Sequence, residues 1–539
     1  MESMPGRDVS AGWSQKDPLA QTTPGKGDHK SALVVFMTCF ACLAPVWLLP
    51  GVYWDGWIYE VALDRGLSAP VLDAYRDNGR TLQGVVLLAF SVFDNSSRAA
   101  NIAGCGAAAL AGMFVYIILS VHLRVPRLFA GLAAVLGVIH PAYLTLISLS
   151  MIAFPLSLPL FWGGLLLVIA GQGGLGGQRS PARVFAGAGL VLVSFVGEVS
   201  VFMTPVLGAI WLARGLSDGL GWQQSLSLAL RHSWWTPALS ALGAFGIAVL
   251  FPLNGEYEGA RLVDSTLKSY VFYFLLYIRK PLEFLGWGIL VGVIALVTLM
   301  RRDKRRPVLN VLLILGAASF AFSIIPYVLA HRGPLNSGWQ ARFLLFSALP
   351  LGMMVSGFCM AIAAMIPRHF PQSLSIALPF VFFIAQLVAV VDQSLTWNAR
   401  WLRDEALLTA ASSIPEDAGL VVFDDRYPAP FGETLRWYEW QAIAVTGTGR
   451  FDIVAATLAT AVEHGMDPAA TAGDMSASGW STGLLETPIR GKCIFFEMNS
   501  EPLIGVSLFQ RFSYVLQQPQ DVAELITLRR LSCPEASKS

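Results

Sequence analysis

Charged side chains are scarce in this chain of 539 residues: only 14% are Asp, Glu, Lys or Arg, whereas soluble domains carry about 25%. Between Arg127 and Arg179 there is no charged residue at all. The formal net charge is only +1, so the chain lacks the concentrated basic surface that nucleic-acid binding needs. Low-complexity disorder is excluded because 55% of the residues are apolar. These absences indicate a polytopic membrane protein.

Long apolar runs are missing from residues 397–539, which hold 11 Lys/Arg against 18 Asp/Glu. Such a change in composition predicts a separate soluble domain. The apolar runs at 420–423 and 493–496 predict buried strands, and the patterns at 404–412 and 453–463 predict helices. Together they predict a small α/β domain. Trp and Arg side chains at its start form an expected interfacial collar: Trp397, Arg400, Trp401 and Arg403.

Cysteines are also few, and four of the six lie in apolar runs, where a thiol behaves as a small hydrophobe. Only Cys493 and Cys533 lie in the acidic tail. They could pair in an oxidising compartment, but two cysteines in a tail of this length also occur by chance.

Charge-free stretches predict about eleven membrane spans. The first is 31–50, which follows a polar N-terminal tail, residues 1–30. The uncharged residues 128–178 are enough for two crossings of about 20 residues each, hinged near 148–150. The region 184–213 is either one long helix or two short ones. The remaining predicted spans are 99–121, 236–253, 284–300, 307–330, 343–367 and 370–391.

Basic loops set the expected orientation, because Lys and Arg accumulate on the cytoplasmic side. They are 122–127, 179–183, 301–306 and 368–369. By alternation, the loops at 51–98, 254–283 and 331–342 and the domain 397–539 lie on the outer face, and the tail 1–30 is cytoplasmic. This parity requires that the 11-residue apolar run at 83–93 does not cross. That run suits a helix in the membrane interface.

The first outer loop, 51–98, contains the segment richest in potential chemistry. Asp55 follows the end of the first span and is flanked by Trp54 and Trp57. Desolvation there favours a carboxylate that works as a general base, and the indole rings offer flat faces for a sugar. Glu60 and Asp64 are further catalytic candidates. The alternative is an interfacial aromatic belt with solvated acids.

The order of features along residues 31–396 resembles the GT-C class of membrane glycosyltransferases, which use polyprenyl-phosphate-linked sugars. The resemblance includes the aromatic and acidic loop, the turn at Asn78-Gly79-Arg80, the interfacial run, and Arg98 before the second span. The stretch 78–82 is most similar to O-antigen glucosyltransferases, and lipid A aminoarabinose transferases belong to the same class. Gln340-Ala341-Arg342-Phe343, with Pro350 eight residues beyond Arg342, resembles the entry to a late span in this class. The resemblance implies a GT-C-like membrane domain with a soluble domain on the outer face.

One departure from the class concerns a second carboxylate, which several of its families place in the next outer loop. Residues 128–178 contain none. This departure argues against a bound metal, and no metal or other cofactor is expected. It also assigns the base chemistry to Asp55, with His140 either a polar partner or a helix-packing residue.

A phosphate-bearing donor needs fixed positive charge on the outer face. By topology the candidates are Arg80, Arg261, Lys268, Arg279, Lys280, Arg332 and Arg342. Arg342 is preferred because it also lies in the family-like motif, whereas snorkelling to headgroups is the alternative for the others. Glu198 separates two uncharged stretches, and a carboxylate at membrane depth is costly. It either orients a substrate hydroxyl or pairs with an arginine, unless it lies in an outer turn between two short helices.

The expected function is therefore that of an inverting glycosyltransferase at the outer face of a bacterial inner membrane. Its partners would be a polyprenyl-phosphate-linked sugar and a glycan or lipid acceptor of the cell envelope, such as lipopolysaccharide. The alternatives are a secondary transporter or flippase for a lipid-linked glycan, and an O-antigen polymerase or ligase.

Overall fold

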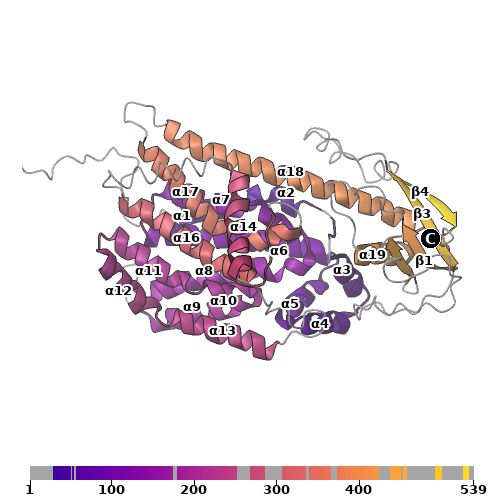
Figure 1. The fold of residues 1–539 in the computed structure, drawn as a ribbon, viewed down its shortest axis with the longest axis horizontal. Helices are drawn as coiled ribbons and strands as arrows, with labels where there is room; N and C mark the ends of the chain where they lie inside the picture. Colours follow the sequence, from indigo (N-terminus) through magenta and orange to yellow (C-terminus); the bar gives the residue numbers. More distant parts are fainter. Residues whose placement is uncertain are drawn as a thin grey trace, which may run out of the picture.

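The computed structural model describes residues 28–49, 51–53, 56–173, 179–251, 267–285, 306–335, 339–365, 373–423, 437–450, 453–457, 492–500 and 526–532. Most of them form a helical bundle, and a four-stranded sheet lies at one end of the molecule (Figure 1). The helices long and apolar enough to cross a membrane in this part of the chain are Ser96–His122, Leu149–Gly171, Val199–Ser217, Val311–Leu329 and Pro379–Asn398. A pair bent by 48°, Arg127–Val138 with Pro141–Ile147, adds a sixth if it is one span. The chain is thus an α-helical membrane protein, and the count of about eleven spans stays a prediction.

The first half of the bundle follows the expected spans with several breaks. Its elements are α1 (Asp28–Cys42), α2 (Ala44–Trp47), α3 (Gly56–Asp64), α4 (Ser68–Asp77), α5 (Thr81–Leu88), η1 (Ala89–Val92), α6 (Ser96–Ile117), the π-turn η2 (Ile118–His122), α7 (Arg127–Val138), η3 (Pro141–Ile147), η4 (Leu149–Met151) and α8 (Ala153–Gly171). The hinge predicted near 148–150 is confirmed, since η3 ends at Ile147 and α8 begins at Ala153. The helical segment Thr81–Val92 is too short to cross.

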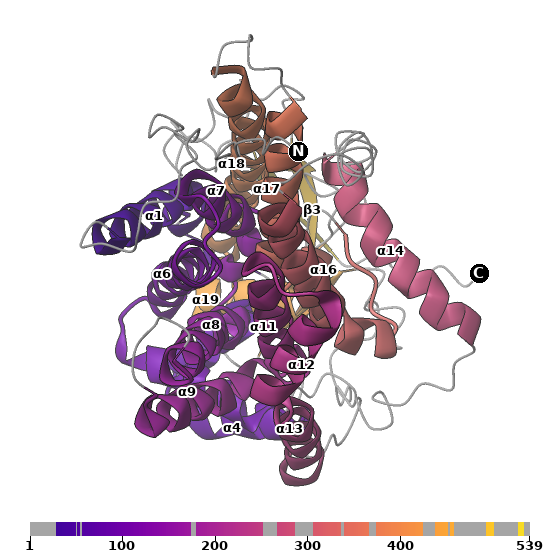
Figure 2. The ribbon, with the colours of Figure 1, turned by 90° about the vertical axis from the view of Figure 1, so that its left-hand side faces the viewer.

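The second half contains α9 (Pro181–Val193), η5 (Ser194–Gly197), α10 (Val199–Met203), α11 (Val206–Ser217), α12 (Trp222–Ser233), α13 (Thr236–Leu250), α14 (Leu267–Leu285), α16 (Arg306–Leu329), η7 (Trp339–Leu344) and α17 (Ala348–Met365). α14 lies at the edge of the bundle beside α16 (Figure 2). The predicted span 284–300 lies almost wholly outside the described residues.

Glycines let the helices of the bundle approach closely, as is common where helices pack in membranes. A Cβ at Gly137 of α7 would lie 2.7 Å from Leu349 Cα of α17. A Cβ at Gly164 of α8 would lie 2.7 Å from the Gly187 carbonyl oxygen of α9. Both crossings therefore bring backbone against backbone and fix how α7, α8, α9 and α17 are placed.

One loop predicted to be cytoplasmic, 122–127, lies against the loop that follows α11. Asp218 forms ion pairs with Arg124 (3.3 Å) and Arg214 (2.9 Å). The Arg214 guanidinium also donates a hydrogen bond to the His122 carbonyl. The loops at 122–127 and 214–222 therefore meet.

The C-terminal elements are α18 (Ser373–Ala411), β1 (Ala418–Phe423), α19 (Trp437–Thr448), β2 (Val454–Thr457), β3 (Lys492–Ser500) and β4 (Ile526–Ser532). The sheet order is β2-β1-β3-β4, with β1 parallel to β2 and β3, and β4 antiparallel to β3. Strands occur at 420–423 and 493–496 as predicted.

One expectation for this region needs revision. The helix predicted at 453–463 is wrong in its described part, where Val454–Thr457 pairs with β1, because the sheet contact outweighs local helical preference. The predicted boundary at 397 stays a prediction: the membrane-length stretch of the 39-residue α18 is Pro379–Asn398, and the same helix continues from the bundle toward the sheet (Figure 1).

Candidate active site

Glu198 lies at the tip of a helical hairpin. α9 and η5 lead to it, and α10 and α11 lead away. Trp211 Nε1 of α11 donates to Gln172 Oε1 (2.8 Å), and a Cβ at Gly171 would lie 2.8 Å from the Val184 nitrogen of α9. Both arms therefore return to the C-terminal end of α8. The region 184–213 is therefore not one long helix: it is divided at Glu198, which lies in the turn between α9–η5 and α10–α11.

The backbone of Glu198 is strained, with φ +52° and ψ −52°. A residue with a Cβ rarely adopts a positive φ, and such a conformation costs about 1–3 kcal/mol. Strain of this kind concentrates at functional sites, where surrounding contacts hold the residue in place.

This strain predicts that, at position 198, a glycine variant is more stable than an alanine variant, the reverse of the order in an ordinary helix. Glu198→Gly is expected to be more stable than Glu198→Ala by about 1 kcal/mol, because only glycine relaxes the positive φ. At Gly189 of α9, where a Cβ meets no other atom, alanine should instead be the more stable residue. Thermal unfolding of the purified variants in detergent measures both differences. An alanine variant at 198 as stable as the glycine variant would contradict the strain.

Two side chains from the first loop hold the Glu198 carboxylate. Arg80 Nε lies 3.4 Å from Glu198 Oε1, and Gln83 Nε2 donates to the same oxygen and to the Val196 carbonyl, each at 3.2 Å. The Gln83 side chain is buried, whereas Arg80 and Glu198 are about half and one third exposed. Of the three readings left open for Glu198, the structure shows the turn between helices and the pair with an arginine, and the orientation of a substrate hydroxyl stays a prediction.

The turn at Asn78-Gly79-Arg80 positions Arg80. Asn78 follows the last residue of α4, Gly79 has a φ of +65°, and the Arg80 N–H donates to the Tyr75 carbonyl at 2.7 Å. A glycine accepts this positive φ without steric cost. Because α5 begins at the next residue, the turn aims both Arg80 and Gln83 at the hairpin tip.

Arg342 reaches the same region from the other half of the chain. Its guanidinium lies 4.9 Å from the centre of the Phe343 ring, and Phe343 packs on Tyr327 of α16 with 5.1 Å between ring centres. The Tyr327 hydroxyl lies within Coulombic range of Glu198, Arg342 and Arg80. We call these four residues, Arg80, Glu198, Tyr327 and Arg342, the polar cluster.

The polar cluster joins three residues that the sequence identified separately and one that it did not. Tyr327 lies in an apolar span, and nothing in its neighbourhood distinguishes it from a packing residue. Gln83 was also missed, although an amide at the start of an apolar run was a usable signal.

Glu60 accepts hydrogen bonds in the first turn of a membrane helix. Its Oε2 accepts from the backbone N–H (3.1 Å) and the hydroxyl (2.6 Å) of Ser97, in the first turn of α6. Burial raises the pKa of the Glu60 carboxyl, although the bonds from Ser97 lower it. Asp64, one turn further along α3, is exposed; partial desolvation raises its pKa and Arg65 lowers it. These placements favour a structural role for Glu60 over the predicted catalytic one.

The raised pKa of Glu60 predicts that the stability of the folded protein depends on pH. Since the folded state holds this proton more tightly, the contribution is largest below the unfolded pKa near 4.5 and is lost as pH rises through the raised value. The melting temperature of wild type should therefore fall relative to that of Glu60→Gln as the pH rises above about 4.5. Glu60→Ala, which leaves the Ser97 N–H and hydroxyl without this acceptor, should cost about 1 kcal/mol. Parallel melting curves for wild type and Glu60→Gln would contradict the prediction.

Asp55 and Trp54 lie outside the described residues, but their neighbours in the chain are placed. Tyr53 is buried, and Gly56 begins α3 against the turn at Ser148 and Leu149. Trp57 is only 5% exposed and donates from Nε1 to Asp404 Oδ2 at 3.4 Å. A buried indole offers no face to a sugar, so the stacking role predicted for Trp57 is not supported.

Four of the other predicted phosphate ligands lie on or next to α14 and α16. Lys268, Arg279 and Lys280 lie on α14, and Arg332 follows α16, whereas Arg261 lies outside the described residues. Lys268, Arg279 and Arg332 are exposed, and Lys280 is half-buried. Among the predicted cations that the structure describes, Arg80 and Arg342 are those whose charges act on Tyr327.

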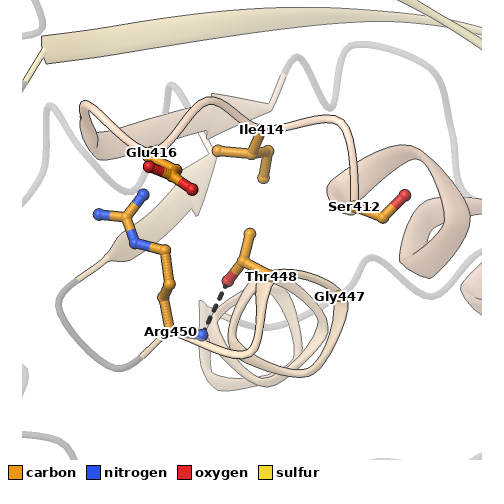
Figure 3. Close-up of a pocket in the computed structure, with 6 residues that line it drawn as sticks. All are labelled: Ser412, Ile414, Glu416, Gly447, Thr448 and Arg450. Carbon is orange, nitrogen blue, oxygen red and sulfur yellow. Dashed lines mark hydrogen bonds between the residues drawn. The ribbon is translucent and has the colours of Figure 1, made fainter.

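A polar cleft of about 530 Å³ lies in the C-terminal region, lined by Ser412, Ile414, Glu416, Gly447, Thr448 and Arg450 (Figure 3). The Arg450 guanidinium donates to the carbonyls of Pro415 (3.0 Å) and Ala418 (2.8 Å), which ties α19 to the start of β1. The cleft shares no lining residue with the polar cluster. In the part of the chain that the structure describes, no group of three or more His, Cys, Asp or Glu side chains could hold a metal ion.

The fold and the site together define an α-helical membrane protein with a charged cluster at one end of its bundle. No protein-family model matches the chain, and no curated protein matches it either.

Proposed function

We propose that this protein transfers a sugar from a polyprenyl-phosphate donor to a glycan or lipid acceptor at the outer face of a bacterial inner membrane. The observation that carries the proposal is the polar cluster. Arg80, predicted as a phosphate ligand, pairs with Glu198, and Arg342, predicted separately, lies with them within Coulombic range of the Tyr327 hydroxyl. Two arginines beside an apolar bundle suit a phosphate that is attached to a lipid tail.

In the proposed reaction, Asp55 acts as the base, and Arg342 and Arg80 act on the leaving phosphate. Asp55 removes the proton from an acceptor hydroxyl, and the acceptor oxygen attacks the anomeric carbon from the face opposite the phosphate. The bond between the anomeric carbon and the phosphate oxygen breaks, so polyprenyl phosphate leaves with one more negative charge. Arg342 and Arg80 stabilise that charge as it develops. The configuration at the anomeric carbon is inverted.

Glu198 keeps Arg80 in place when no phosphate is bound. An ion pair between partly exposed side chains is worth only about 0–1 kcal/mol, so a phosphate can displace the carboxylate at little cost. Gln83 holds the same carboxylate oxygen and the hairpin backbone, which keeps the tip in place during the exchange.

The proposed orientation rests on the separation of charged groups between the two ends of the bundle. Arg124 lies with Arg214 and Asp218 at the end reached by α11 and α12, whereas Glu198 lies at the opposite end of the same hairpin. The positive-inside rule then puts the first end in the cytoplasm and the polar cluster outside.

One observation favours a second candidate, a flippase for a lipid-linked glycan. Transporters use paired charges at breaks between membrane helices, and Arg80 and Glu198 form such a pair at the break between η5 and α10.

The proposal is tested with purified protein in liposomes. Polyprenyl phosphates carrying glucose, mannose or aminoarabinose are mixed with an envelope glycolipid extract, and the lipid products are resolved by mass spectrometry. A glycosyltransferase releases free polyprenyl phosphate and adds one sugar mass to the acceptor. A flippase moves the intact donor across the bilayer, and a polymerase or ligase adds a whole glycan. Either of the latter outcomes without single-sugar transfer contradicts the proposal.

A further inference from the structure

The first loop and the C-terminal region share one hydrophobic core. Trp57 and Val61 of α3 are buried in a cluster whose other members come from α18 and the residues beyond it: Leu407, Ala411, Ile414, Ala418, Val421, Trp440, Ala442, Ile443, Ala444, Val445, Ile453, Ala455 and Ile494. α3 packs directly on α19 (Figure 1). The C-terminal region therefore includes part of the first loop in its interior.

α18 contacts the chain on both sides of the Trp54-Asp55 segment. On the N-terminal side, a Cβ at Gly51 would lie 2.7 Å from Trp401 Cγ, and the Tyr53 ring meets the Trp397 ring edge-on at 5.6 Å. On the C-terminal side, Trp57 Nε1 donates to Asp404 Oδ2. One helix thus fixes residues 51–53 and residue 57.

Buried charges reinforce this contact. Arg400 and Glu439, with side chains 3% and 2% exposed, form an ion pair of 3.8 Å between α18 and α19. The Arg400 guanidinium also lies 4.4 Å from the centre of the Trp397 ring. Burial and the Asp404 carboxylate raise the pKa of the Tyr53 hydroxyl, and Arg400 lowers it, so Tyr53 lies within Coulombic range of both charges. Buried charges tolerate little displacement, because their desolvation is offset only in one geometry.

We propose that this contact is a clamp that positions the catalytic loop, so that the C-terminal region is part of the active enzyme. Its positioning residues are Asp404 and Trp57, which hold the loop, with Arg400 and Glu439, which join α18 to α19. The inference rests on the proposed function, because the loop carries Asp55. It assigns to the C-terminal region the fixing of residues 51–53 and 57, on either side of Asp55, while the polar cluster binds the donor phosphate.

The test uses Asp404→Asn, which keeps the size of the side chain but removes its charge, and Trp57→Phe, which removes the N–H donor. The matched control is Glu416→Gln, the same chemical change at an exposed carboxylate beyond α18. The clamp predicts a 10- to 100-fold lower kcat for both variants, with the KM for the donor and the elution volume unchanged. The double variant should be no slower than the slower single variant, because the two side chains act as a unit.

A second measurement does not depend on activity. In the full-length protein, hydrogen exchange of the amides at 52–60 should be at least tenfold faster in Asp404→Asn than in Glu416→Gln. Unchanged exchange in Asp404→Asn would overturn the clamp even if wild type transfers sugar. Absence of transfer by wild type, with faster loop exchange in Asp404→Asn, would instead overturn the proposed function and leave the clamp as a structural contact.

Discussion

Asp55→Asn is expected to lower the rate of sugar transfer by about 10³-fold, within the range of about 10²–10⁴ that a general base contributes. The amide has nearly the size of the carboxylate but cannot take the proton of the acceptor hydroxyl. The measurement is the rate of polyprenyl phosphate release in liposomes, at saturating donor and acceptor.

Asp73→Asn provides the matched control for this change. Asp73 lies in the same loop, is exposed, and pairs with Arg76 at 3.0 Å. Its variant should keep nearly the full rate. If Asp55→Asn retains a third or more of the wild-type rate while folding normally, Asp55 is not the base.

Arg342→Ala is expected to lower kcat/KM for the donor by about 10²–10³-fold, as removal of a group that stabilises developing charge typically does. Arg342→Lys should recover only part of this loss, because lysine lacks the planar guanidinium that lies over Phe343. Steady-state kinetics with varied donor measure both effects, and inhibition by free polyprenyl phosphate should weaken in parallel.

Arg183→Ala serves as the control for Arg342, since Arg183 is an exposed arginine at the start of α9, away from the hairpin tip. Its variant should bind donor and product as wild type does. Equal losses in the two variants would show that the effect is one of overall charge and not of the polar cluster.

Much of the fold could be predicted because apolar runs and turn residues act locally. The break near 148–150, the short helix at 81–92, the turn at Gly79 and the strand at 420–423 all follow from residues close in sequence. The strand at Val454–Thr457 could not be predicted in this way, because its partner in the sheet is β1, more than thirty residues away.

In the candidate site, too, local sequence identified the single residues, whereas their arrangement depends on contacts between distant segments. Arg80, Glu198 and Arg342 stand out as charges next to membrane spans, so each could be recognised alone. Their convergence depends on packing of α5 against η5, of α10 against α16 and of α16 against η7, which no local pattern encodes. Trp57 illustrates the converse: its chemistry suggested sugar stacking, but its hydrogen-bond partner Asp404 lies 347 positions later, and that contact buries it.

The core shared by α3 and the C-terminal region has a consequence for biosynthesis. A ribosome adds about 5–20 residues per second, so Asp404 emerges roughly 20–70 s after Trp57, its partner 347 positions earlier. Throughout that interval the apolar face of α3 lies without the residues that bury it. In the nascent chain, Trp57 and Val61 therefore become buried only after residues 404–494 have been synthesised.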